Sequence, residues 1–196
     1  MTILVKQLSE LSRTALLEHF LALAPDDIHL RFGSSLSAEG IRAYVDRIDF
    51  NHDAVFGVFD DELRLVGVAH LALDPEHDAA ELGLSVLPGH RGRSVGSTLL
   101  QRAETHARNY YIKTLFMHCL AENQAMMHIA QKTGMRVIVE GGGEADAHLE
   151  LAPPDAANVS QELMQERAAL WDVALKAQFL AARKFATAMT AKIPKS

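Results

Sequence analysis

The part of the chain best suited to chemistry is the stretch between residues 88 and 97. A strand-like run, Glu81–Leu87, leads through a Pro-Gly turn to Arg91 and Arg93, then to small residues that open an amphipathic helix. Unpaired backbone N–H groups and the positive end of such a helix bind anions, most often phosphate. Small side chains let the anion approach the backbone, and the arginines supply charge-assisted donors. The alternative is an ordinary loop with two exposed arginines.

Two common nucleotide motifs do not fit this loop. No Gly-Lys-Ser/Thr follows its glycines, and the spacing is not the Gly-x-Gly-x-x-Gly of a dinucleotide turn. A metal site is also considered because the chain has 10 histidines. They are scattered, without a His-x-His or His-x-x-x-His pair, so we expect surface and half-buried histidines and no metal.

Composition narrows the class of protein. The chain has 196 residues, 48% of them hydrophobic and 22% charged, which suits one globular domain with an appendage. Its net charge of −6 argues against nucleic acid or an anionic membrane as the main partner. Cys119 is the only cysteine, which fits a reducing compartment, and no apolar run approaches the length of a membrane span. We therefore expect a cytoplasmic protein.

Hydrophobic periodicity predicts an α/β chain with a mixed α+β sheet. Alternating and continuous apolar runs predict strands, including a hairpin joined by Asp60-Asp61-Glu62. Asn123 is expected to cap a helix that stops at Gly134, with Met135 as the apolar partner beyond it. The predicted strands are 2–7, 54–59, 63–73, 81–87, 114–119, 137–139 and 148–151. The first predicted helix starts near Ser9 or Ser12, and further helices are predicted over 26–32, 37–48, 94–110 and 123–134.

The C-terminal part reads as a separate element. Pro153-Pro154 breaks the chain, so we expect a domain over residues 1–152 and a helical extension over 153–196. Apolar residues at spacings of three and four predict one long helix from Asn158 to Lys192. Its seam packs either on its own domain or against a second copy in a homodimer. The seam comprises Met164, Ala168, Trp171, Leu175, Phe179, Ala182, Ala186 and Met189.

Two motifs in this order resemble the GNAT superfamily of acyl-CoA-dependent N-acetyltransferases. The family's pyrophosphate motif, Arg/Gln-x-x-Gly-x-Gly/Ala, stands here at 91–96 with Ser94 in place of the first glycine. Its second block, Asn-x-x-Ala-Met and a helix closed by Gly and an apolar residue, resembles 123–127 and 134–135. The resemblance covers residues 2–151, and two motifs about 30 residues apart are more specific than either alone.

Within the superfamily, further stretches resemble the acetyltransferase domains of bacterial protein-lysine acetyltransferases. These are Leu30-Arg31-Phe32 with Leu36-Ser37, the Ala80-Glu81 strand start, and Met126-Met127 with Ala130. The fused synthetase-like or nucleotide-sensing regions of those proteins do not occur in this chain, so the resemblance concerns the catalytic module and leaves the substrate open.

The resemblance implies a splayed central sheet flanked by helices, with acetyl-CoA as acyl donor. Backbone N–H groups near Leu87 would bind the thioester and pantetheine, and those of the loop would bind the pyrophosphate. Asn123 would cap its helix and orient the cofactor or the cleft. The expected cofactor-binding residues are Leu87, Arg91, Gly92, Arg93, Ser94, Val95, Gly96, Ser97 and Asn123.

Glu81 is the expected catalytic residue. Strand alternation places Glu81, Gly83 and Ser85 on one face, which puts a carboxylate beside two small residues. An alkylammonium has a pKa near 10.4, so a base must take its proton directly or through water. A surface glutamate at a strand start is the alternative, and the family resemblance favours the general base.

No general acid can be assigned from the sequence. The superfamily often uses a tyrosine four residues before the glycine of the second motif, and that position is Ala130 here. Water or His118 can protonate the departing thiolate instead. Cys119 is not expected to carry an acyl group, because only His118 beside it offers a base and lone strand cysteines are usually buried.

The leading hypothesis is therefore an acetyl-CoA-dependent N-acetyltransferase in which a primary amine attacks directly in a ternary complex. A non-catalytic acyl-CoA sensor is the first alternative, suggested by Ser94 and the missing tyrosine. An interaction protein that acts through its C-terminal helix is the second. The acceptor, a small-molecule amine or a protein lysine, stays open.

Overall fold

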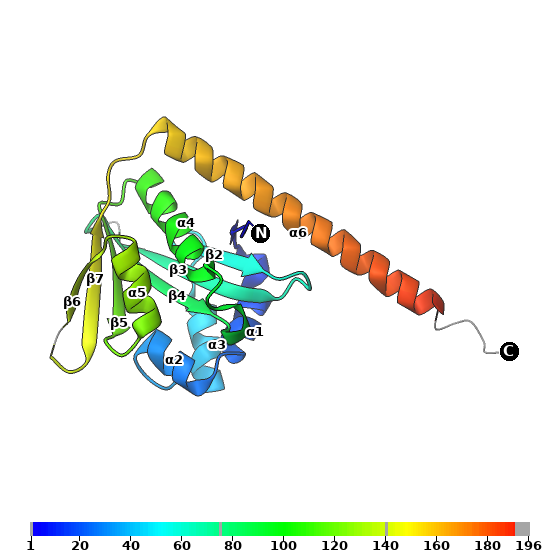
Figure 1. The fold of residues 1–196 in the computed structure, drawn as a ribbon, viewed down its shortest axis with the longest axis horizontal. Helices are drawn as coiled ribbons and strands as arrows, with labels where there is room; N and C mark the ends of the chain where they lie inside the picture. Colours follow the sequence, from blue (N-terminus) through cyan, green and yellow to red (C-terminus); the bar gives the residue numbers. More distant parts are fainter. Residues whose placement is uncertain (1, 75, 140, 191–196) are drawn as a thin grey trace.

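The chain forms a mixed seven-stranded sheet with helices on both faces and one long helix at its C-terminal end (Figure 1). The computed structural model describes residues 2–74, 76–139 and 141–190, apart from the side chains of residues 189 and 190. Its elements are β1 (Lys6–Gln7), a 3-10 turn (Glu10–Ser12), α1 (Arg13–Leu21), α2 (Pro25–Phe32), α3 (Ala38–Arg47), β2 (Ala54–Phe59), β3 (Leu65–Asp74), β4 (Ala79–Val86), a 3-10 turn (Pro88–His90), α4 (Val95–Asn109), β5 (Thr114–Leu120), α5 (Gln124–Lys132), β6 (Arg136–Val139), β7 (Glu144–Glu150) and α6 (Ala156–Thr190).

The sheet is splayed at its centre, as the family resemblance implied. Its strand order is β1-β2-β3-β4-β5-β7-β6, and every pairing is antiparallel except that of β4 with β5. The parallel pairing extends only from Ala79–Glu81 on β4 to Thr114–Phe116 on β5. Beyond it, β4 continues to Val86 and β5 to Leu120 without pairing to each other. A wedge therefore opens between the two strands.

Two hydrophobic cores fill the two faces of the sheet. Helices α4 and α5 cover one face and α1, α2 and α3 cover the other (Figure 1). Neighbouring residues of β2 follow this division: Phe56 packs in the first core and Val55 in the second, and both are completely buried. Because side chains of a strand alternate between faces, a strand buried on both sides is apolar at every position. The apolar run 54–59 has this pattern.

Most elements agree with the sequence-based prediction, and the predicted caps are confirmed. Asn123 Oδ1 accepts a hydrogen bond from the Met126 amide at 3.2 Å. At the other end of α5, Gly134 has a left-handed φ of +79°, and the Met135 amide donates to the Ala130 carbonyl at 3.0 Å. These are the bonds that close a helix through a glycine. The second block of the sequence thus forms a helix with both ends fixed.

The prediction was wrong about two strands. The first strand was predicted over residues 2–7, but β1 spans only Lys6–Gln7. The last was predicted over 148–151, whereas β7 spans Glu144–Glu150 and pairs along its whole length with β5. Ala145 and Ala147 are the buried positions of β7. Alanine has low strand propensity, so this alternation of buried alanines with polar residues gave no strand signal.

The first half of helix α6 packs on α4 and β1. Further along, Lys176 Nζ donates to the Phe59 carbonyl at 3.0 Å and Arg183 lies 3.8 Å from Glu62, and the end of the helix extends beyond the domain (Figure 1). The predicted long helix is confirmed as far as Thr190; the Met189 side chain and Lys192 fall outside the described residues. Ala169 is almost completely buried on the side that faces α4 and β1. Within the described part of the chain, no helix is long and apolar enough to cross a membrane.

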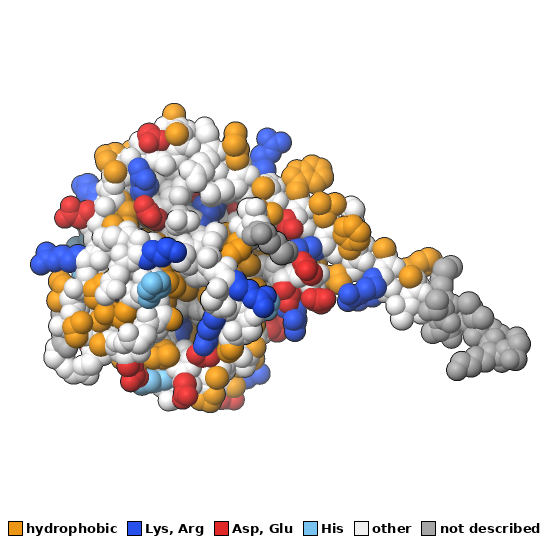
Figure 2. Space-filling view, viewed as in Figure 1, with side chains coloured by type: hydrophobic (Ala, Val, Ile, Leu, Met, Phe, Trp, Pro, Cys, Tyr) orange, Lys and Arg blue, Asp and Glu red, His pale blue; other side chains and the backbone are white. Residues whose placement is uncertain are grey.

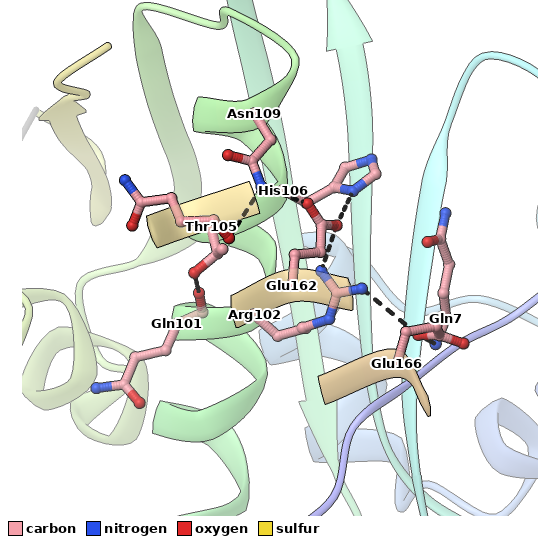
Figure 3. A network of polar contacts seen from close by, with 9 residues as sticks. Gln7, Gln101, Arg102, Thr105, His106, Asn109, Glu162 and Glu166 are labelled. Carbon is pink, nitrogen blue, oxygen red and sulfur yellow. Dashed lines mark hydrogen bonds and ion pairs between the residues drawn. The ribbon is translucent and has the colours of Figure 1, made fainter. Parts of the chain in front are cut away.

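A buried polar network holds α6 on α4 (Figure 3). The Arg102 guanidinium, 2% exposed, lies 2.6 Å from the Glu162 carboxylate, which also accepts from His106 Nδ1 at 2.6 Å. The Glu166 carboxylate accepts a hydrogen bond from the backbone N–H of Gln7 at 2.9 Å and so connects α6 to β1. Burial raises the pKa of Glu162, but the hydrogen bonds from His106, Asn109 and Arg102 outweigh it and lower the pKa to about 2. The network therefore requires an ionised Glu162.

Glu162→Gln should lower the free energy of unfolding by about 3 kcal/mol, because it leaves the buried Arg102 without its main counter-charge. Denaturant unfolding at pH 7 measures the effect, with the exposed Glu18→Gln as the matched control. The folded-state pKa lies below the ordinary 4.5, so this stabilisation is complete above pH 4.5 and is lost as the pH falls towards 2. A difference between wild type and variant that stays constant down to pH 2 would contradict this assignment.

Candidate functional site

One cleft follows the loop singled out in the sequence. This loop cleft, of about 370 Å³, lies between the end of β4, the start of α4 and α5. Its lining includes Val86, Ser94, Gly96, Ser97, Met126 and Lys132. A Cβ added at Gly96 would lie 2.8 Å from Ile129 Cδ1. Glycine therefore lets the first turn of α4 approach α5 closely and leaves its amides at the wall of the cleft.

The backbone of the loop offers several free donors. From Gly92 to Ser97, no amide donates to a carbonyl of the described residues; the first that does is Thr98, to Ser94 at 3.0 Å. The first N–H groups of any helix lack a partner within it, and the Ser94 side chain makes no cap bond here. Free amides and the positive end of α4 therefore meet at the loop cleft. This arrangement can bind a phosphate group.

Ser94 keeps the backbone shape that the glycine of the family motif would have. Its φ of 63° and ψ of 9° are left-handed, a conformation that costs a residue with a side chain on the order of 1 kcal/mol. The loop therefore keeps its left-handed turn with a serine at position 94.

The two arginines of the loop have different surroundings. Arg91 Nη2 lies 2.8 Å from the Asp27 carboxylate, and its Nε donates to the Val86 carbonyl at 3.0 Å. Arg91 thus fastens the loop to α2. Arg93 is exposed and makes no ion pair with any residue that the structure describes. It does not line the loop cleft, so only its charge is near the site.

Strand β4, next to the loop, also presents backbone amides to the wedge, but the expected amide of Leu87 is not among them. The Leu87 amide donates to the Val66 carbonyl of β3 at 2.9 Å and is therefore occupied. In an antiparallel pair, alternate residues direct their N–H groups to opposite sides. Val86 and Leu84 consequently direct theirs away from β3, towards the unpaired edge of β4. These amides, rather than that of Leu87, are free to bind a ligand in the wedge.

A second cleft lies over the sheet and contains Glu81. This sheet cleft, of about 420 Å³, is lined by β4, β5 and β7 and by the end of α2. Glu81 pairs with Phe116 and His118 with Asp146, so these side chains share one face of the sheet. His118 Nδ1 is hydrogen-bonded to the Asp146 carboxylate. Glu81 is exposed and accessible to an incoming molecule.

The two clefts share a wall. Leu30, Arg31, Leu84 and Met126 line both of them. Asn123 supports this junction from α5: it is 8% exposed, lines the loop cleft, and its Nδ2 donates to the Leu30 carbonyl at 3.4 Å. The loop with free amides and the carboxylate of Glu81 thus lie on opposite sides of one junction. Two ligands bound in the two clefts would meet there.

Two further positions considered in the sequence, Ala130 and Cys119, do not supply a reactive group at this junction. Ala130 is completely buried, so nothing on α5 at this position reaches a ligand. Cys119 lines the sheet cleft, but burial raises the pKa of its thiol, and the nearby charge of Asp146 raises it further. A thiol with a raised pKa is a poor nucleophile at neutral pH.

One polar group in the loop cleft was missed from the sequence. His19 Nε2 lies 2.8 Å from the Ser85 hydroxyl, and His19 Nδ1 lies 2.9 Å from the Leu65 carbonyl. Because a carbonyl only accepts, Nδ1 carries the proton and Nε2 accepts from Ser85. Burial lowers the pKa of His19 to about 4, so the ring is neutral at pH 7. The pair orients the Ser85 hydroxyl at the wall of the loop cleft.

A comparison with protein families gives one match. The model of the acetyltransferase (GNAT) family matches residues 14–135. This range contains the loop, both predicted motifs and the residues that line the shared wall of the two clefts.

The fold is also similar to those of solved acetyltransferase structures. The GNAT domain of PAT from S. lividans is 18% identical, with a TM-score of 0.65 over 75% of this chain and 89% of that one. An N-acetyltransferase from Thermoplasma acidophilum in complex with coenzyme A is 21% identical, with a TM-score of 0.59 over 76% and 99%. Spermidine N-acetyltransferase from Vibrio cholerae, in complex with CoA and spermine, is 19% identical, with a TM-score of 0.58 over 74% and 94%.

Proposed function

Because the chain belongs to the acetyltransferase (GNAT) family, we propose that it transfers an acetyl group from acetyl-CoA to a primary amine. The observation that carries this proposal is the pair of clefts with a shared wall. The donor would occupy the loop cleft and the acceptor the sheet cleft, so that both are bound when the bond forms. The amine nitrogen then attacks the thioester carbonyl directly, without an acyl-enzyme.

The loop cleft has the groups that the donor requires. Its pyrophosphate would accept hydrogen bonds from the free amides of Gly92–Ser97, and the charge of Lys132 lines the same cleft. The pantetheine arm would follow the unpaired edge of β4, where the Leu84 and Val86 amides are available. A polarised thioester carbonyl needs such backbone donors, each of which matters at the level of a few kcal/mol.

Glu81 is the residue that would take the proton from the amine. It is the carboxylate of β4 on the face that forms the sheet cleft, and it is exposed to solvent. The proton passes from the ammonium to Glu81 directly or through water, and the nitrogen lone pair then attacks. Ala130 supplies no acid for the departing thiolate, which is a weak base that water can protonate.

Ser97→Glu should weaken acetyl-CoA binding at least tenfold, because it places a carboxylate where the pyrophosphate would lie. A carboxylate in the first turn stabilises a helix, so a loss of binding would not reflect unfolding. Calorimetric titration measures the affinity, and Ser160→Glu on the exposed side of α6 is the control. Equal affinity of Ser97→Glu and wild type would remove the loop cleft as the donor site.

Glu81→Gln should lower kcat by about 100-fold or more, the usual contribution of a general base, and leave acetyl-CoA affinity unchanged. Steady-state kinetics with a saturating amine, at several pH values, measures the effect. Glu150→Gln, an exposed glutamate outside both clefts, should behave as wild type. Full turnover by Glu81→Gln would exclude the role. A wild type that binds acetyl-CoA but acetylates no small amine and no protein lysine would instead be an acyl-CoA sensor.

The exposed side of α6 supports a second proposal, that two copies of the chain associate through it. Met164, Trp171, Leu175 and Phe179 lie at spacings of seven and four and are 71, 69, 50 and 74% exposed. Apolar side chains follow the protruding part of α6 (Figure 2). An aromatic residue buries roughly 150–250 Å². Two such helix faces together therefore approach the ~1,000 Å² of a specific interface.

The division into residues 1–152 and 153–196 stays a prediction.

Phe179→Glu should convert a dimer of the full chain into a monomer, because it places a charge in this apolar face. Sedimentation velocity over a range of concentrations measures the mass. Ala177→Glu, on another exposed side of α6, is the control and should remain a dimer. A wild-type chain that is monomeric at every concentration, or a dimer that survives Phe179→Glu, would contradict this proposal.

A further inference from the structure

Arg31 occupies the junction of the two clefts. It lies in the last turn of α2 and lines both the loop cleft and the sheet cleft. Its guanidinium rests directly on the backbone of β4, because a Cβ added at Gly83 would collide with it. The absence of a side chain at Gly83 thus makes the space that the guanidinium fills. The group is placed where donor and acceptor would meet.

A chain of half-buried polar groups fixes the guanidinium there. Arg31 Nη2 donates to the Tyr44 hydroxyl at 3.0 Å, and this hydroxyl lies 2.8 Å from His70 Nδ1. His70 Nε2 in turn lies 3.0 Å from the Asp53 carboxylate. The guanidinium also lies over the ring of Phe32, at 4.9 Å from its centroid. Such support from packing and hydrogen bonds is typical of a binding group and not of a solvated side chain.

Arg31 nevertheless has no carboxylate partner. Among the described residues, no Asp or Glu oxygen lies within 4.0 Å of its guanidinium. Other arginines near the core each have one: Arg13 pairs with Glu10, Arg91 with Asp27, and Arg102 with Glu162. A fixed guanidinium in a concave site has a planar fork of donors that matches a carboxylate. Its remaining donors are available to a ligand.

Glu81 gives this site a second charge of opposite sign. Glu81 and Gly83 are two residues apart on one face of β4, about 7 Å along the strand, and the guanidinium lies over Gly83. From these positions we infer that the acceptor is an amine that carries a carboxylate close to its amino group, as α-amino acids do. Arg31 binds the carboxylate and Glu81 faces the amine. This inference rests on the proposed acetyl transfer and adds the class of acceptor to it.

Arg31 disfavours a second cation in its own part of the sheet cleft, whereas the carboxylates of Glu144 and Asp146 line the β7 side of the same cleft. A polyamine has only cationic groups, so its binding would bring a second cation next to the guanidinium of Arg31 in a partly enclosed cleft. Like charges that approach in this way repel each other. An amino acid pairs with the charges of Arg31 and Glu81 at once.

Three pairs of amines test the inference, because the members of each pair differ only by the carboxylate. They are leucine and 3-methylbutylamine, lysine and 1,5-diaminopentane, and phenylalanine and 2-phenylethylamine. Wild type should prefer the amino acid in at least one pair by roughly 30-fold in kcat/KM, which is typical of a hydrogen bond to a charged group. Arg31→Gln should reduce this preference to about twofold or less, mainly through a higher KM for the amino acid.

Control variants separate recognition from folding. Arg42→Gln on the exposed side of α3 removes the same charge and should keep the wild-type preference. Tyr44→Phe removes the hydroxyl that positions Arg31 and should give an intermediate preference. Arg31→Lys, which keeps the charge but not the fork, should also be intermediate if Arg31→Gln proves unstable.

The outcomes that would overturn the inference are distinct from those that would overturn acetyl transfer. An equal loss for both members of a pair in Arg31→Gln would place Arg31 in the transition state or the fold, not in carboxylate recognition. A wild-type preference for the decarboxylated amines would also overturn the inference. Transfer to protein lysines alone would overturn it and leave the proposed function standing. No acetyl-CoA binding at all would overturn the function itself.

Discussion

The short parallel pairing of β4 with β5 is the constraint on which both clefts depend. Ala79–Glu81 of β4 pair with Thr114–Phe116 of β5, and beyond these residues β5 pairs only with its other neighbour, β7. The remaining edge of β4 has backbone groups without a partner in the sheet. In most folds such an edge would be covered or paired, because an unpaired strand edge can pair with another chain and cause aggregation. Here the open edge lies where the loop cleft and the sheet cleft meet, so its free backbone groups are available to a ligand.

Helix α4 must stay in place for this wedge to be useful, and it is held along its length by different forces. At its start, the missing side chain of Gly96 allows close packing on α5. In its middle, Leu99 and Ala103 are completely buried against the sheet. Near its end, Arg102 and His106 are tied to Glu162 of α6. The apolar contacts fix the distance of α4 from the sheet, whereas the ionic network connects it to a helix outside the family's matched range. A movement of α6 would therefore act on the helix that follows the loop of Gly92–Ser94.

Local signals made much of this structure predictable from the sequence, and long-range pairing accounts for what was not. The turn and glycines around Gly92 and Gly96, and the cap at Asn123, act over a few residues, so their spacing was sufficient. The parity of β4 was not, because the direction of the Leu87 amide depends on its register with Val66 of β3. The His19–Ser85 pair spans 66 residues and has no local pattern at all. Glu81 was identified with the help of the family resemblance, since its own spacing equally suits a surface residue.

The two clefts differ in the kind of group that lines them, and this difference bears on how the chain can vary. The proposed donor site relies on backbone amides, so a serine can stand at position 94 as long as its left-handed turn is kept. The proposed acceptor site relies on the side chains of Arg31 and Glu81, which come from α2 and β4. Arg31 in turn depends on Tyr44 of α3 and on His70 of β3. On the proposed assignment, a change of acceptor would require coordinated changes in several elements, whereas the turn at position 94 can change as long as its backbone conformation is kept. The two proposals therefore assign specificity for the amine to the layer formed by α2 and α3, and affinity for the donor to the wedge.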